Sequence, residues 1–458
     1  MRLSLPLLPL LFTAACRAPV DSGLDTSETE DTAVAGVRVD LGAFRPRNVV
    51  VVHVDTLRAD ALPRWGNTRD TWPLLEAREG WVSVDRAVST AAWTAPATAS
   101  LLTGTDQPTH GVRFFDERGT NYPMGAPSFV SYLADQGMRT ALVTGSEILM
   151  GEVFELATGF GTAQGVGEEP GNAAGTVDVA VDWLDTLDAD EPFLLFLQPM
   201  DMHAPYRPEE EDLFTWADPA DVPFHIDDPT AAQVFQIVEA LDAATTDEEH
   251  ARLLAGLRAV YDEQALGVDR AIDALMAALE TRGLLDDTLI VVTADHGESF
   301  LDGPPVSLGH GASVRNELVH VPLLFWGAGV VDTHLPCVAS NMDVFPTIVD
   351  ALGLAPLPSA EGRSLLEGCR EHAFSALYFA SAGVETLGYI GVESREAQVA
   401  YECQEGGVLA FDLLADPLAT NLLPLADVPG GEALADTLDA YVAEVLTTLP
   451  ALSCVTAR

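Results

Sequence analysis

The sequence predicts an α/β fold in which a layered sheet carries helices on both faces, followed by a small carboxyl-terminal antiparallel α+β subdomain. Continuous β-branched runs, NVVVVHVD from Asn48 and TLIVVTA over 288–294, are typical of strands buried on both faces of a parallel sheet. A helical stretch precedes the second run, because Val268, Ile272 and Leu275 recur on one apolar face. Alternation of strand and helix indicates a layered α/β domain.

The remaining elements follow in order along the chain. Further buried strands are expected at TALVT (140–144), FLLFLQ (193–198) and PLLFWG (322–327). After about residue 356 the helices give way to short strand-like pieces, LGYIGV, AQVAYEC and VLAFDLL, with turn residues between them. Short strands joined by turns are typical of antiparallel pairing. We therefore expect a main domain over 47–355 and a smaller subdomain over 356–458.

The charge of the chain excludes some classes of function. The 458 residues include 70 acidic and 23 basic side chains, which gives a formal net charge of -47, and 48% of the chain is apolar. The apolar content predicts a folded protein with a core, while the charge argues against nucleic-acid binding because polyphosphate would be repelled. Lysine is absent, so no step of a mechanism can use a lysine amine.

The amino terminus reads as an export signal over 1–16. An apolar run from Leu3 to Phe12 follows one arginine, and it is shorter than the roughly 20 residues that span a bilayer. Small residues directly before Cys16 resemble the lipobox of bacterial lipoproteins, in which the cysteine is lipidated, although Thr13 stands where leucine is usual. A plain cleaved signal and a buried core segment are the alternatives. We expect an exported protein, either secreted or an envelope lipoprotein of the outer membrane or periplasm.

Residues 17–46 are rich in acidic, hydroxyl and small side chains and lack apolar periodicity before the arginines, which predicts an acidic flexible tether. Contact with the membrane would then run through the lipid anchor alone. Four further cysteines occur in the last third of the chain, at Cys337, Cys369, Cys403 and Cys454. In an exported protein they suggest up to two disulfides, with three possible pairings, or else free core thiols.

Acidic and imidazole side chains follow two of the predicted strands. Asp55 ends the first run, and Asp295 and His296 directly follow TLIVVTA. Ligands of open α/β sheets bind outside the carboxyl ends of the strands. Carboxylate oxygen and neutral imidazole both suit a divalent cation such as Zn or Mn, and the oxygens also suit Ca or Mg. Taken alone, Asp55 is equally well explained as a helix cap.

The motifs in combination resemble one known family. NVVVVHVDTLRADAL, TAPATASLLTGTDQPTHGV, DMHAPYRP, RGLLDDTLIVVTADHGESF and LGHGASVRNELVHVPLL occur in the order found in sulfatases, and the resemblance covers about residues 47–425. The chain is thereby similar to bacterial sulfatase-like hydrolases or transferases of the alkaline phosphatase superfamily. This resemblance implies an alkaline-phosphatase-like layered sheet, one divalent metal ion, and a small-molecule, glycan or lipid ester as substrate.

The resemblance also assigns roles to individual residues. Asp55, Asp295 and His296 fall on metal-ligand positions, and Thr94 falls on the nucleophile, which also contacts the metal. Pro96 and the helix-like ATASLLTG that follow would place Thr94 at a helix amino end, where backbone N–H groups favour an anionic ester.

Further histidines belong to the same comparison. His203 and His310 match positions that contact substrate or protonate the leaving group, with ordinary polar packing as the alternative. His110, in PTHGV, could contact substrate or only bond backbone. His53 is expected to be a core or sheet-face residue, and Asp201 either approaches the metal or serves a turn.

The sequence also departs from the family pattern. Sulfatases oxidise a cysteine or serine to formylglycine, which threonine cannot give, so no formylglycine is expected at Thr94. Ala97 and Thr98 replace the motif's serine and arginine, and Thr56 replaces its second acidic residue. A threonine nucleophile resembles the phosphodiesterase and phosphonate-type branches, and absence of the usual membrane-embedded helices favours a hydrolase over a lipid-linked transferase. The alternative is a non-catalytic lipoprotein that binds a glycan or a protein partner.

Overall fold

The computed structural model describes residues 36–456 apart from 115–122, 167–171, 189, 223–224, 226–231, 303–307 and 382–383. The predicted export signal, Cys16 and residues 17–35 of the predicted tether lie outside the described residues. Within the described ranges, no helix combines the length and the apolar character needed to cross a membrane.

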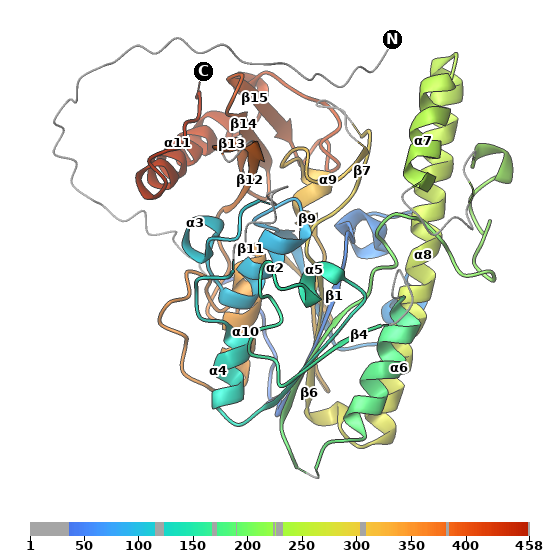
Figure 1. Ribbon diagram of the computed structural model, residues 1–458, viewed down its shortest axis with the longest axis vertical. Coiled ribbons are helices and arrows are strands. Elements are labelled where there is room, and N and C mark those ends of the chain that lie inside the picture. The colour runs from blue at the N-terminus through green and yellow to red at the C-terminus, as the bar shows by residue number, and fades with distance from the viewer. Residues whose placement is uncertain are drawn as a thin grey trace.

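A large mixed sheet forms the centre of the molecule (Figure 1). Within the described residues its strands run in the order β11-β2-β10-β6-β1-β5-β3-β4, and β9 pairs with β2. Their bounds are β1 Asn48–Val54, β2 Trp81–Val88, β3 Arg139–Thr144, β4 Thr162–Gly165, β5 Phe193–Gln198, β6 Thr288–Ala294, β9 His320–Val321, β10 Leu323–Trp326 and β11 Thr333–Ser340.

The central strands confirm the predicted buried runs. β1 pairs in parallel with β5 on one side and with β6 on the other, and every residue of these three strands is buried. β10 is different, because it runs antiparallel to both β6 and β2 although its residues are also all buried. A continuous apolar run reports burial of both faces, and it carries no information about strand direction.

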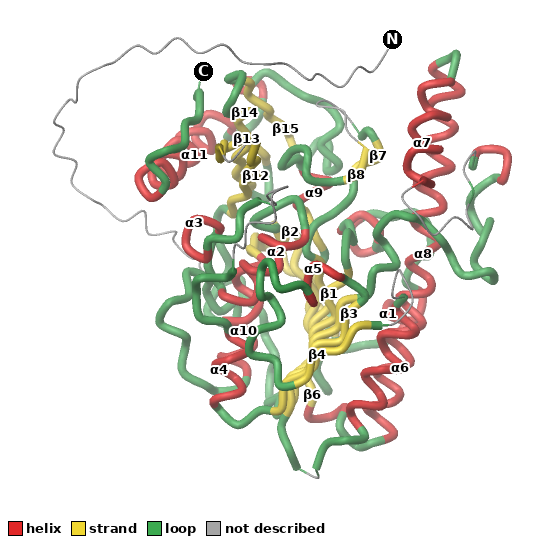
Figure 2. The backbone as a smooth tube through the Cα atoms, in the orientation of Figure 1, coloured by secondary structure: helices red, strands yellow, loops and turns green. Residues whose placement is uncertain are grey.

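Helices cover both faces of this sheet, as predicted (Figure 2). One face is covered by α6 (Ala173–Leu184) and α8 (Asp247–Thr281), and the other by α2 (Thr94–Thr103), α4 (Phe129–Asp135) and α10 (Val344–Ala351). The predicted apolar stripe of α8 is buried at Val268, Ile272 and Leu275. The shorter elements are α1 Pro73–Ala77, α3 Gln107–His110, α5 Glu147–Met150, α7 Ala232–Ala243, α9 Asn316–Val319, β7 Ser299–Phe300 and β8 Leu308–Gly309.

The carboxyl-terminal part is an antiparallel sheet with one long helix, which confirms the predicted α+β character. The sheet runs in the order β12-β13-β14-β15 and α11 packs against it around a separate apolar cluster. The bounds are β12 Ala373–Ser381, β13 Val384–Glu393, β14 Ala397–Glu402, β15 Gly407–Asp412 and α11 Gly431–Thr448.

The end of the predicted tether belongs to the folded domain. Val39, Leu41 and Phe44 are buried in the main core, and the Val39 N–H donates to the Leu365 carbonyl. The prediction that the tether reaches residue 46 is therefore wrong. The three apolar side chains are too few for a periodicity to stand out in the sequence, and Leu365, the backbone partner of Val39, lies more than 300 residues further along the chain.

Two disulfides select one of the three pairings left open by the sequence. Cys337 bonds Cys369, and Cys403 bonds Cys454. The first bond joins β11 to the segment that precedes β12, and the second ties the end of the chain to the residue after β14. None of these four cysteines is a free thiol.

Candidate active site

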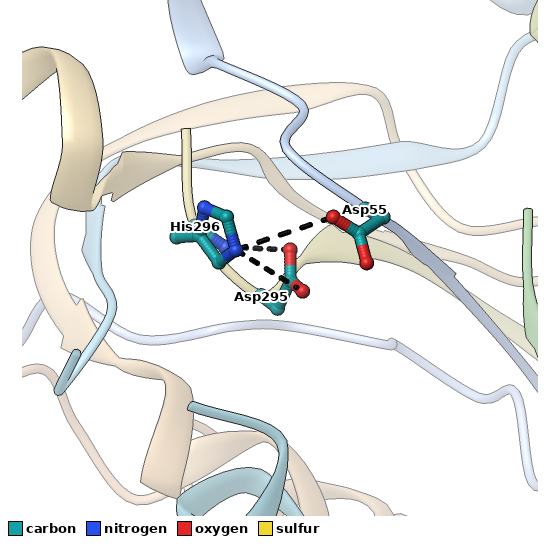
Figure 3. Close-up of side chains that lie close together, drawn as sticks. All are labelled: Asp55, Asp295 and His296. Atoms are coloured by element: carbon teal, nitrogen blue, oxygen red, sulfur yellow. Dashed lines mark hydrogen bonds and ion pairs between the residues drawn. The ribbon is translucent and has the colours of Figure 1, made fainter. Parts of the chain in front are cut away.

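Three predicted ligands converge at the carboxyl edge of the central sheet. Asp55 follows β1, and Asp295 and His296 follow β6; all three side chains are fully buried. The Nε2 atom of His296 lies 3.5 Å from Asp295 Oδ2 and 4.0 Å from Asp55 Oδ1. Figure 3 shows this nitrogen directed toward both carboxylates. The ligand atoms of the three residues all lie within 4.8 Å of one another.

The sheet register and a strained turn produce this convergence. Val54 pairs with Ala294, so the residues that follow the two strands leave the sheet side by side. Thr56 has a φ of 57°, a left-handed conformation that is costly for a β-branched residue. In this conformation its N–H donates to Asp295 Oδ1 at 3.0 Å, and its carbonyl accepts from the hydroxyl of Tyr261 at 2.8 Å.

The chemistry of these residues fits a divalent cation. Asp55 Oδ1 and Asp295 Oδ2 are buried oxygens with no hydrogen-bond partner among the described residues. Nδ1 of His296 lies 2.8 Å from the Gly297 carbonyl, which can only accept, so Nδ1 carries the proton and Nε2 presents its lone pair. Burial and the neighbouring carboxylates of Asp295 and Glu298 raise the pKa of Asp55 well above its usual range. A cation would offset this concentration of buried negative charge.

Thr94 lies beside the three predicted ligands. It is the first residue of α2, and its hydroxyl lies 3.5 Å from Asp55 Oδ2 and 3.4 Å from His296 Nε2. All ten residues of α2 are buried, so the helix has little freedom to move the hydroxyl. The helix amino end adds a partial positive charge at this point, which favours an anionic group near Thr94.

A pair of histidines lies next to this centre. The ring centroid of His310 lies 4.5 Å from that of His296 and 5.0 Å from that of His203. Nδ1 of His310 contacts Glu298 Oε1 at 3.0 Å, and the Tyr206 hydroxyl donates to Glu298 Oε2 at 3.0 Å. His310 is about a quarter exposed, so the pair opens toward solvent.

The two histidines have opposite pKa shifts. Burial and the neighbouring His310 lower the pKa of His203. Burial alone would lower the pKa of His310 as well, but the carboxylate of Glu298 outweighs it and the pKa is raised. Titratable neighbours whose pKa values are pushed apart are suited to separate acid and base roles.

An arginine joins the two loops that carry the predicted ligands. Arg58 donates from Nη1 to the Glu298 carbonyl and to Asp302, both at 2.9 Å, and it forms a two-point contact with Asp60 at 2.8 Å. Arg258 also donates to Asp60, at 3.1 Å. Both cations lower the pKa of Asp60 below its usual range, against the effect of burial. The turn after β1 and the loop after β6 are thus held together by ion pairs.

Two residues of this region were not predicted. No role was predicted for Glu298, although it stands in the motif TADHGE, two residues after His296. Gln198 is the last residue of β5, and its Nε2 donates to Asp55 Oδ2 at 3.2 Å. The signal that identified Asp55, a polar residue at the end of a buried strand, was also present at Gln198.

Three other residues named in the sequence analysis bond protein groups or pack in the core. His110 is fully buried, accepts from the Val112 N–H at Nδ1 and contacts the Ser100 hydroxyl through Nε2, so both ring nitrogens bond protein groups. His53 is a buried sheet-face residue beside Phe196, as expected. Asp201 accepts from the first N–H of α6, at Ala173, and so contacts a helix amino end.

The fold and the site define a class of protein: an α/β protein with a candidate metal centre at the carboxyl edge of its sheet and the hydroxyl of Thr94 at a helix amino end beside it. Comparison with known proteins identifies a family of this class. The chain belongs to the sulfatase family, whose model matches residues 47–354. The predicted family and fold class are confirmed.

Individual relatives cover different parts of the chain. Arylsulfatase K of Mus musculus is 32% identical over 114 residues, 25% of this chain and 20% of the relative. The multifunctional alkaline phosphatase superfamily protein PehA of Trinickia caryophylli is 32% identical over 183 residues, 39% of this chain and 34% of the relative. The matched segments thus span from a fifth to a third of these curated relatives.

A solved structure matches more of the fold. The phosphonate monoester hydrolase of Agrobacterium radiobacter is 20% identical, with a TM-score of 0.62, and the match covers 89% of this chain and 96% of that chain. At this identity the similarity concerns the fold.

Proposed function

We propose that this protein is a metal-dependent hydrolase of phosphate diesters, phosphonate esters or sulfate esters, with Thr94 as its nucleophile. The observation that carries the proposal is the position of the Thr94 hydroxyl, 3.5 Å from Asp55 and 3.4 Å from His296 at the amino end of α2. Asp55, Asp295, His296 and the Thr94 oxygen would hold one divalent ion. When bound, the ion supplies Lewis-acid stabilisation of the ester oxygens and lowers the pKa of the hydroxyl.

The residues of the chain divide the reaction into two steps. The Thr94 hydroxyl loses its proton to solvent, and Oγ1 forms a bond to phosphorus or sulfur while the bond to the leaving alcohol oxygen breaks and that oxygen takes up a proton. His310 is suited to supply the proton, because Glu298 holds the imidazole at Nδ1 and favours its protonated form. Water then attacks the phosphorus or sulfur atom, the bond from that atom to Thr94 Oγ1 breaks, and Thr94 is regenerated. A histidine that has lost its proton, His203 or His310, accepts the proton of the attacking water.

The names of the relatives support this range of substrates. One is an arylsulfatase, one is a multifunctional member of the alkaline phosphatase superfamily, and one is a phosphonate monoester hydrolase. Thr94 cannot form formylglycine, which favours phosphate or phosphonate chemistry over that of sulfatases. A small molecule, a glycan or a lipid could supply the ester.

The test combines metal content with two substrates. The chain from residue 17 onward is purified, its metal is determined by elemental analysis, and p-nitrophenyl sulfate is compared with bis-p-nitrophenyl phosphate for the wild type and Thr94→Ala. We expect metal-dependent cleavage of the phosphodiester that Thr94→Ala abolishes. Undiminished cleavage by Thr94→Ala would refute the nucleophile. Bound metal without turnover of either ester would favour the alternative, a non-catalytic lipoprotein that binds a glycan or a partner.

We also propose that the chain is exported, with Cys16 lipidated. The two disulfides support an oxidising compartment outside the cytoplasm. Mass spectrometry of the mature amino terminus tests the anchor: a diacylglyceryl cysteine is expected, and cleavage at another residue without lipid would refute it.

A further inference from the structure

Polar side chains at the ends of two neighbouring strands are linked by hydrogen bonds to Asp55 of the candidate metal centre. β3, β5 and β1 are adjacent in the sheet, and Thr144, the last residue of β3, pairs in register with Gln198, the last residue of β5. Both side chains are at most 1% exposed. The Thr144 hydroxyl lies 3.0 Å from Gln198 Oε1, and Gln198 Nε2 lies 3.2 Å from Asp55 Oδ2.

The direction of these hydrogen bonds is determined by their partners. The Asp55 carboxylate can only accept, so it takes an N–H of Gln198, and Gln198 Oε1 accepts the proton of the Thr144 hydroxyl. The same hydroxyl accepts from the Ser146 N–H at 2.9 Å. The amide of Gln198 is then oriented with its NH2 group toward Asp55. Because an amide N–H can only donate and does not ligate a cation, Gln198 contacts the carboxylate and not the metal.

This arrangement distinguishes the two oxygens of Asp55. Oδ2 accepts from the amide of Gln198 and lies 3.5 Å from the Thr94 hydroxyl, whereas Oδ1 has no hydrogen-bond partner among the described residues. When Thr94 gives up its proton to act as a nucleophile, Oδ2 keeps only the donor from Gln198. The amide has no proton to lose at neutral pH, so it can hold the carboxylate in one orientation throughout a reaction.

We propose that Gln198, itself held by Thr144, is a positioning residue that orients the Asp55 carboxylate for the divalent ion. The inference rests on the proposed function, since it concerns the ion that the proposed hydrolase would bind. Partners that orient metal ligands typically change metal affinity by about 10- to 100-fold when they are lost. Gln198→Met keeps the length of the side chain and removes both hydrogen bonds, and Thr144→Val keeps the shape of threonine and removes its hydroxyl.

The experiment measures metal binding directly, so it does not depend on turnover. Mn²⁺ and Zn²⁺ are titrated separately by calorimetry into the metal-free full chain. We expect Gln198→Met to weaken binding of the metal by about 10- to 100-fold and Thr144→Val to weaken it by a smaller factor. Because Thr144 acts through Gln198, the double variant should bind no more weakly than Gln198→Met alone. The matched control is Thr140→Val, in the same strand; among the described residues, the Thr140 hydroxyl bonds only the backbone of Gly159 and Gly161.

The outcomes separate this inference from the proposed function. Thermal unfolding of each metal-free variant establishes that the variant is folded. If Gln198→Met does not fold, Gln198→Glu is used in its place, since it keeps the shape of the side chain and the contact with Thr144. Gln198→Glu replaces the N–H donor with a carboxyl group and should also weaken metal binding. If a folded Gln198 variant binds both ions as tightly as the wild type, the positioning role of Gln198 is refuted, while the proposed metal centre is unaffected. A wild type that binds neither ion would overturn the metal centre itself, and this inference with it. An equal loss in Thr140→Val would show a general effect of strand packing and would also overturn the proposal.

Discussion

The ion pairs around Asp60 lead to a quantitative prediction for Asp60→Asn. Asp60 accepts from Arg58 at two points and from Arg258, and its side chain is 14% exposed. The substitution keeps the shape of the side chain but leaves two arginines with one fewer counter-charge. Removing one partner of a buried ion pair costs about 3–5 kcal/mol, and the partial exposure of Asp60 places the expected loss near the lower limit. A loss of about 3 kcal/mol reduces the folding equilibrium constant by roughly a hundredfold.

The pH dependence of the same variant follows from the direction of the pKa shift. The pKa of Asp60 is lower in the folded state than in the unfolded state, so its carboxylate stabilises the fold above an unfolded pKa of about 3.9. This contribution is lost as the pH falls toward the folded pKa. The stability difference between wild type and Asp60→Asn should therefore be full at pH 7 and pH 5 and smaller at pH 3.

The assay is urea unfolding of both proteins with the disulfides intact at these three pH values. Asp273→Asn is the matched control, since Asp273 forms a more exposed ion pair than Asp60, with Arg78 at 2.8 Å, and its loss should change stability by no more than about 0.5 kcal/mol. A loss below about 1 kcal/mol at pH 7, or a difference that does not change with pH, would show that the Asp60 ion pairs contribute little net stability.

Three further predictions concern other parts of the molecule. Glu298→Gln removes the charge that holds His310, and loss of a charged hydrogen bond of about 1.5–3 kcal/mol should lower kcat/KM roughly 10- to 100-fold; unchanged steady-state kinetics would contradict it. Replacing Cys337 and Cys369 with serine opens a loop with a sequence separation of 32 and should lower the free energy of unfolding by about 4 kcal/mol in denaturant titrations; a change below about 1 kcal/mol would contradict the prediction. Burial and the neighbouring Glu361 raise the pKa of Asp106 to about 6, so the folded state loses stability as the pH rises from about 4 to 6. The melting temperature of Asp106→Asn should rise relative to that of the wild type over this range, and a constant difference would argue against the shift.

Much of the fold could be predicted because the central strands are buried on both faces. β1, β5 and β6 are continuous apolar runs, which are the clearest signal that a parallel sheet leaves in a sequence. The direction of β10 could not be predicted, because its residues are as buried as those of the parallel strands β1, β5 and β6. β12 was not singled out, since it reads AFSALYFAS and alanine and serine give a weak strand signal.

The candidate site could be predicted only in part. Asp55, Asp295, His296 and Thr94 stand in motifs, and the structure brings them together; their chemical roles stay proposals. Gln198 acquires its contact with Asp55 from the register of neighbouring strands, which the sequence alone does not show. The contact between His110 and Ser100 likewise depends on how α3 turns back against α2.

The strand order of the central sheet also affects how the protein acquires its site. β1 and β6 pair directly, and the hydrogen bond from Thr56 to Asp295 joins residues 239 positions apart. Contacts between residues so far apart in the sequence cost much chain entropy, so they slow folding. They also cannot form until the whole intervening chain has been synthesised. A nascent chain that ends before β6 therefore lacks two of the three predicted ligands, Asp295 and His296, and the proposed metal binding should report the pairing of β6 with β1.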